Sequence, residues 1–193
     1  LGVSINSNIT LETPNTVPKF QNTWGMGYDN NFDTWGTITV SGQQYKEQSG
    51  WMIDNWGGKM DGQLIGIATM PDLGLVPLIG QPKDNIKNFY RTGVTTSNTI
   101  SLSSVSDKIN FRASVSNMSN KGIIPNNSFD KQTINFLVGA NVSEKLYVEA
   151  KANYIRQATE NRPYIGSNRR NVSFSLNYTA RHVNLDWLKN YKN

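Results

Sequence analysis

Hydrophobic and polar residues alternate along the first twelve residues of the chain, LGVSINSNITLE. The apolar residues Val3, Ile5, Ile9 and Leu11 occupy odd positions, whereas Ser, Asn, Thr and Glu occupy the even positions from 4 to 12. A period of two places apolar side chains on one face of a β-strand and polar side chains on the other. The pattern therefore predicts a strand near residues 1–12 with one dry face and one wet face.

The same alternation returns in four later segments, VTTSNTISLSS, INFRASVS, TINFLVGANV and LYVEAKANY. Apolar residues make up only 37% of the chain, below the roughly 45–50% of average globular proteins, so a thick protein core is not expected. We predict an all-β fold of amphipathic antiparallel strands. The four further strands are predicted near residues 94–104, 109–117, 132–142 and 146–157.

The connections between these strands alternate between long and short. A long connection, 13–92, follows the first strand, whereas SVSDK and SEK are tight turns and NMSNKGIIPNNSFDK is a longer loop. Compact domains seldom contain so long a connection without a function, and outer-membrane β-barrels have short turns at one end and long loops at the other. A tilted strand of about 11 residues also spans roughly the 25 Å apolar band of that membrane. Within the long connection, PKDNIKNFYRTG predicts a short helix.

The dry faces allow two interpretations. They contact lipid in a transmembrane β-barrel, or they contact a second sheet in a soluble, carbohydrate-binding β-sandwich module. The wet faces carry Ser, Thr and Asn together with Arg112, Glu149 and Lys151, which would line a barrel lumen and pair with one another or with residues of a plug. A need for detergent would favour the barrel, and a soluble monomer would favour the sandwich.

The charged residues do not indicate catalysis or nucleic-acid binding. The formal charge of +5 is scattered and no nucleic-acid recognition motif accompanies it. The single histidine, His182, has no Ser or Cys motif around it, and Asp54 and Asp61 lie in a Gly-rich segment where carboxylates usually fix turns. The chain has no cysteine, and DNNFD lacks the glycine and the glutamate of a calcium loop. We expect no enzyme, no metal site, no cofactor and no nucleic-acid partner.

Five aromatic residues of the long connection are the candidate ligand-binding residues. Aromatic rings offer flat apolar area with a polar edge to sugars and peptides. The alternative is that these rings only pack the connection against the barrel wall or the plug. The candidates are Trp24, Tyr28, Trp35, Trp51 and Trp56.

Several stretches resemble SusC/RagA-type TonB-linked outer-membrane transporters of Bacteroidetes. They are NWGGKMDGQ, DNIKNFYRTGVTTSNTISLSS, KINFRASVSNMSNKGIIPN, YVEAKANYIRQATENRP and VNLDWLKNY. LGVSINSNITLETPNTVPKFQNTWGMG resembles the passage from plug to first barrel strand in that family. The resemblance is weakest from Asp33 to Ser49, and Gly58 stands where the family usually has a proline.

The resemblance implies a 22-stranded barrel that encloses an N-terminal plug and imports oligosaccharides or peptides across the outer membrane. Residues 1–193 would be the N-terminal part of this barrel, with the outer loop 13–92 and an outer-loop tail, 158–193. Five strands alone would leave backbone groups unpaired in lipid, so we expect a fragment that lacks the plug and the rest of the barrel. The expected partners are the remainder of the transporter, a SusD-like surface lipoprotein, TonB-ExbB-ExbD acting through missing segments, outer-membrane lipid, and a glycan or peptide substrate.

Overall fold

The computed structural model describes residues 1–29, 36–49 and 54–189, which form two compact units. The sheet unit comprises Leu1–Thr13 and Tyr90–Arg162, and the mixed unit comprises Pro14–Phe89 and Pro163–Asn193. Strands account for 51% of the chain and the helices are short, so the predicted all-β class is confirmed.

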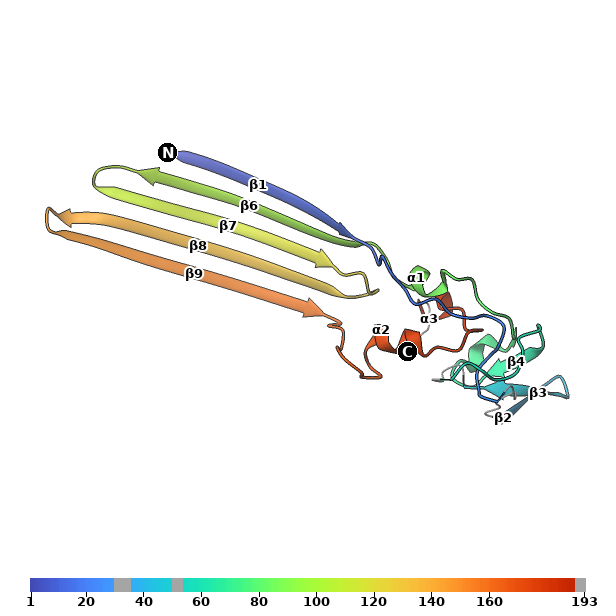
Figure 1. The fold of residues 1–193 in the computed structure, drawn as a ribbon. Helices are drawn as coiled ribbons and strands as arrows, with labels where there is room; N and C mark the ends of the chain where they lie inside the picture. The colour runs from blue at the N-terminus through green and yellow to red at the C-terminus, as the bar shows by residue number, and fades with distance from the viewer. Residues whose placement is uncertain (30–35, 50–53, 190–193) are drawn as a thin grey trace. The chain divides into compact units, whose positions relative to one another are not determined.

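The sheet unit is a five-stranded antiparallel sheet in the order β1-β6-β7-β8-β9 (Figure 1). Every segment with alternating apolar and polar residues forms one strand of this sheet, as predicted. The strands are β1 (Gly2–Glu12), β6 (Gly93–Val105), β7 (Ile109–Lys121), β8 (Ser128–Ser143) and β9 (Leu146–Glu160).

Tight turns and long connections lie at opposite ends of this sheet (Figure 1). The turns 106–108 and 144–145 lie at the end where β1 begins, because Gly2 of β1 pairs with Ser103 of β6. The loop 122–127 lies at the other end, where Arg91 holds it by donating from Nε to the Gly122 carbonyl at 2.8 Å. The predicted alternation of shorter and longer connections is therefore present. The loop 122–127 is shorter than the predicted loop NMSNKGIIPNNSFDK, because β7 and β8 stay paired as far as Lys121 and Ser128.

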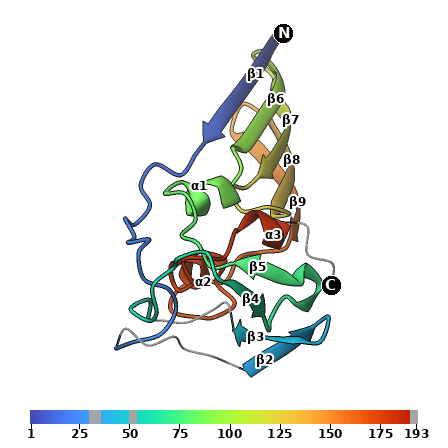
Figure 2. The same ribbon diagram turned by 90° about the vertical axis from the view of Figure 1, so that its right-hand side faces the viewer.

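The sheet unit is a single layer in its described residues (Figure 2). Every residue of β1 and of β9, the two edge strands, is exposed. Apolar and polar side chains of this unit are thus separated onto two faces without a hydrophobic core between layers.

The mixed unit contains a small sheet in the order β2-β3-β4-β5, in which β3 and β4 pair in parallel and the other pairs are antiparallel. The parallel pair departs from the predicted antiparallel arrangement. The strands are β2 (Gly36–Val40), β3 (Gln43–Gln48), β4 (Leu64–Ile67) and β5 (Leu75–Pro77).

Four short helices complete the described part of the mixed unit. The helix predicted in PKDNIKNFYRTG is α1, whereas α2 and α3 form in the tail, for which no helix was predicted. The helices are η1 (Pro71–Leu73), α1 (Asn85–Phe89), α2 (Val172–Asn177) and α3 (Asp186–Lys189). No helix in the described residues is long and apolar enough to cross a membrane.

The core of the mixed unit joins the long connection to the tail. Ile65 and Ile67 of β4 are buried, as are Val183 and Leu185 of the tail. The Asn85 side chain links the two segments, because its Nδ2 donates to the Val183 carbonyl at 2.9 Å and its Oδ1 accepts from the Leu185 amide at 3.0 Å. Residues 163–193 therefore belong to the same folded unit as residues 14–89, which the sequence pattern did not indicate.

Candidate functional site

Apolar side chains of the five long strands line up in rows across one face of the sheet. One row runs from Ile5 through Ile100, Val115 and Ile134 to Tyr154, each residue paired with the next. Ile5 is 74% exposed and Val115 is 57% exposed. Aliphatic surface is normally removed from water, so this face indicates a contact with another apolar phase or molecule.

On β7, β8 and β9 the apolar rows give way to mostly polar residues beyond Tyr154, whereas β1 continues with Ile9 and Leu11 on the same face. The next row toward the long connections is polar, from Ser7 through Asn98, Asn117 and Gln132 to Arg156. Along β9 the apolar part from Leu146 to Tyr154 rises about 26 Å at ~3.3 Å per residue. The predicted strands of about 11 residues were too short for β8 and β9, which have 16 and 15 residues, because the hydrogen-bond ladder continues past the apolar rows.

The opposite face of the sheet is polar and carries the three charged candidates. Lys151 Nζ lies 3.0 Å from Glu149 Oε1, so the predicted pairing is present for these two residues. Arg112 has no ion-pair partner among the described residues. Arg112 and Lys151 flank Leu137 in the sheet register and line a shallow hollow of about 430 Å³ with Ser114, Asn135 and Asn153.

The mixed unit brings three of the five aromatic candidates together. Segment 23–28 runs beside segment 54–60: Trp24 bridges to Lys59, and the Trp56 amide donates to the Gly27 carbonyl at 2.8 Å. Tyr28 is 57% exposed and Trp56 is 59% exposed, whereas Trp24 is half-buried. Trp35 and Trp51 lie outside the described residues.

Glycine makes this close pairing possible. A β-carbon on Gly25 would lie 3.3 Å from Met60 Cγ and 3.4 Å from the Gly58 carbonyl oxygen. Gly27 has a φ of 118°, which side chains of L-residues rarely permit. The glycines of NTWGMG and NWGGKM therefore hold two backbone segments together and leave Tyr28 and Trp56 at the surface.

The residues considered for catalysis are either buried without a hydrogen-bond partner among the described residues or exposed. His182 is fully buried, and neither ring nitrogen has a hydrogen-bond partner among the described residues. Burial disfavours the charged ring and lowers the pKa of His182 to about 4, so the ring is neutral at pH 7. Asp54 and Asp61 are exposed.

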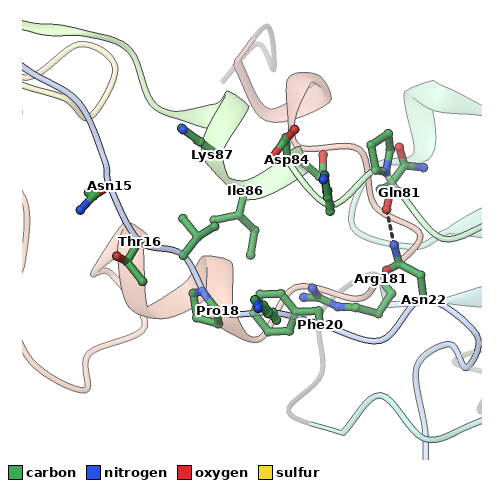
Figure 3. Close-up of a pocket in the computed structure, with 15 residues that line it drawn as sticks. Asn15, Thr16, Pro18, Phe20, Asn22, Gln81, Asp84, Ile86, Lys87 and Arg181 are labelled. Carbon is green, nitrogen blue, oxygen red and sulfur yellow. Dashed lines mark hydrogen bonds between the residues drawn. The ribbon is translucent and has the colours of Figure 1, made fainter.

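A pocket that the sequence did not reveal lies within the mixed unit (Figure 3). Its volume is about 570 Å³, and residues 15–20, 81–87 and Arg181 contribute to its lining. Three segments that are distant in sequence form it, so no local motif or periodic pattern marks it.

Neither a protein-family model nor a curated protein sequence matches this chain.

Proposed function

We propose that this chain forms part of the barrel wall and outer vestibule of a SusC/RagA-type, TonB-linked importer of the outer membrane. The observation that supports this most is the single-layer sheet, with aliphatic rows exposed on one face and Ser, Thr, Asn and charged side chains on the other. Lipid on the first face and water in a lumen on the second would satisfy both sets of side chains.

The two edges of the sheet support the same proposal. Each edge strand, β1 and β9, has one side without a partner strand in the sheet unit. A lipid environment requires such backbone groups to be paired by further strands. In the proposed 22-stranded barrel, strands beyond residues 1–193 continue the sheet from both edges and surround a plug.

The boundary at Tyr154 agrees with a membrane interface. A rise of about 26 Å along β9 becomes about 20 Å for a strand tilted by ~40°, which covers most of the roughly 25 Å height of an outer-membrane apolar band. Tyrosine favours the level of the lipid headgroups, where its ring is in apolar surroundings and its hydroxyl is hydrated. The polar residues of β7, β8 and β9 beyond Tyr154 then stand in water on the side of the long connections, as an extension of the barrel wall.

The mixed unit is the part of the chain that would meet the substrate. It is formed by the long connection and the tail, which this topology places outside the cell, and it exposes Tyr28 and Trp56. In this proposal the aromatic side chains contact an oligosaccharide or peptide beneath a SusD-like lipoprotein. TonB-ExbB-ExbD supplies energy through the missing plug, and no enzymatic step or cofactor is required.

Neighbouring single cysteines test where the two faces lie. The chain has no native cysteine, so Val115→Cys and Ser116→Cys each carry a unique site for an environment-sensitive fluorophore. Val115 and Ser116 are adjacent on β7 and face opposite sides of the sheet. In the reconstituted protein, brominated lipid should quench the label at 115, and aqueous iodide should quench the label at 116.

Two other results would contradict the proposal. Quenching of both labels by iodide alone would place both faces in water. Protection of the label at 115 from both quenchers would place a second protein layer over the apolar face, as in the β-sandwich alternative.

A further inference from the structure

The pocket of the mixed unit combines an apolar wall with positive charge (Figure 3). Pro18, Phe20 and Ile86 form apolar lining, and Asn15, Thr16 and Gln81 add polar groups around it. All of these residues belong to the mixed unit. The pocket therefore offers different chemistry from the exposed pair Tyr28 and Trp56.

Arg181 lies in the wall of this pocket and is only 8% exposed. Its guanidinium carbon lies 3.8 Å from the centroid of the Phe20 ring. One terminal nitrogen donates to the Thr179 carbonyl, but Nε is buried and has no hydrogen-bond partner among the described residues. A buried N–H without an acceptor is costly and rare in folded proteins, so this donor requires an acceptor that the described residues do not supply.

Other cations surround the same pocket. Lys19, Lys83 and Lys87 contribute to the lining, together with a single carboxylate, Asp84. None of the three lysines forms an ion pair within the described residues. Four cationic side chains and one anionic side chain give the pocket an excess of positive charge, which attracts anions.

We propose that this pocket binds a small organic carboxylate, with its anionic group at Arg181 and its apolar part against Phe20. The planar guanidinium matches the geometry of a carboxylate, and a charge-assisted hydrogen bond satisfies the unpaired Nε–H. Burial lowers the pKa of Arg181 to about 10 by desolvation, and a bound anion offsets that loss of hydration. The site does not depend on which face of the sheet meets lipid.

Such a carboxylate has two plausible chemical sources, an acidic sugar and the C-terminal end of a peptide. Glucuronate and N-acetylphenylalanine represent these sources, and glucose and N-acetylphenylalanine amide are their uncharged counterparts. Calorimetric titration of the full chain should detect binding of at least one acid and weaker binding of its neutral counterpart. The acid that binds identifies the source, whereas equal affinity for acid and neutral compound, or no binding of either acid, overturns the proposal.

Substitutions locate the anion within the pocket. Arg181→Gln removes the charge and the Nε–H donor, and should weaken binding by about 10- to 100-fold. Because Arg181 is buried, Lys87→Gln provides a second test at an exposed position; it should weaken binding about 2- to 5-fold and reduce its dependence on salt.

Lys121→Gln is the matched control for charge, because Lys121 is exposed on the sheet unit. Unchanged affinity in Lys121→Gln, together with the losses at 181 and 87, supports the site. Equal effects of Lys87→Gln and Lys121→Gln would show only attraction to net charge and would overturn it. Inorganic phosphate that binds as tightly as the acids and is insensitive to Arg181→Gln would overturn it as well.

Discussion

Tyr147 of β9 lies across Gly139 of β8, with its hydroxyl oxygen in the space that a β-carbon at Gly139 would occupy. Tyr147 Cζ lies 2.8 Å from that β-carbon position. Tyr147 pairs directly with Asn141, so its ring reaches Gly139 diagonally across the two strands. Asn110 Nδ2 also donates to the Tyr147 hydroxyl at 3.4 Å, which extends this contact to β7.

Gly139→Ala should therefore destabilise the sheet by about 1–3 kcal/mol, because the added methyl group displaces the Tyr147 ring and the Asn110 side-chain amide from their positions. Thermal unfolding of the reconstituted protein measures the change. The matched background is the double variant Tyr147→Ala with Asn110→Ala, because Asn110 Oδ1 also lies close to the β-carbon position at Gly139. In that background Gly139→Ala should be neutral or slightly stabilising, since alanine loses less backbone entropy than glycine. An equal loss in both backgrounds would mean that the ring does not cause the effect.

Cysteine labelling on whole cells should show which end of the sheet lies outside. Lys121→Cys, at the end with the long connections, should react with a membrane-impermeant thiol reagent. Ser106→Cys and Glu144→Cys, in the tight turns, should react only after the outer membrane is opened. Asn126 lies in the adjoining loop 122–127 but has a φ of 64°, so a cysteine there would add backbone strain. Labelling at 106 or 144 on intact cells would reverse the proposed topology.

Trp56→Ala and Tyr28→Ala should each weaken substrate uptake by about 2- to 10-fold, the contribution of one aromatic contact, with little effect on folding. Both side chains are mostly exposed, so their removal leaves little empty space. Trp24→Ala should instead reduce stability, because Trp24 is half-buried and its removal leaves a cavity.

Tyr164→Ala is the control for these aromatic substitutions, because Tyr164 is 49% exposed and lies outside segments 23–28 and 54–60. Uptake assays and thermal unfolding on the same variants separate binding from stability. Normal uptake by both Trp56→Ala and Tyr28→Ala would assign these rings to packing alone.

His182 should make the mixed unit less stable in mild acid. Its pKa is about 4 in the folded protein and 6.5 as the ordinary value, so the unfolded chain binds the proton more tightly. The stabilisation is complete above about pH 6.5 and is lost as the pH falls toward 4, by an amount on the order of 3 kcal/mol.

The single histidine gives one Cε1–H resonance in a proton NMR titration, which should report a midpoint well below 6.5. His182→Leu should remove the loss of stability between pH 6.5 and 5, where few carboxylates titrate. A midpoint near 6.5 in the folded protein would contradict the burial of the ring.

The presence and order of the five long strands could be predicted because a strand's period is local. Each alternation, such as that of Val3 and Ile5 with Ser4 and Asn6, indicates that the segment is a strand and which residues lie on each of its two faces. The tight turns then determine which strands are neighbours. The strands extend beyond the predicted ends in β7, β8 and β9, because polar residues such as Asn120, Asp130 and Glu160 continue the backbone ladder without an apolar signal.

The mixed unit could not be predicted in this way, because its contacts join residues far apart in sequence. Gln81 Nε2 donates to the His182 carbonyl at 3.0 Å, across 101 residues, and Arg181 stacks on Phe20. No periodic pattern in the sequence indicates either contact. The segments that form these contacts would each be predicted as loops when considered alone.

The sequence by itself therefore determined the strands, their two faces and the alternation of short and long connections, since all three depend on neighbouring residues. Only the tertiary structure decided that residues 14–89 and 163–193 share one core, and that Arg181 lies beside Phe20 in the wall of a pocket. It also decided that Gly139 provides the space for Tyr147. The physical reason is that burial and steric fit depend on contacts between side chains that are distant in sequence. The hydrophobic periodicity of a segment carries no information about those contacts.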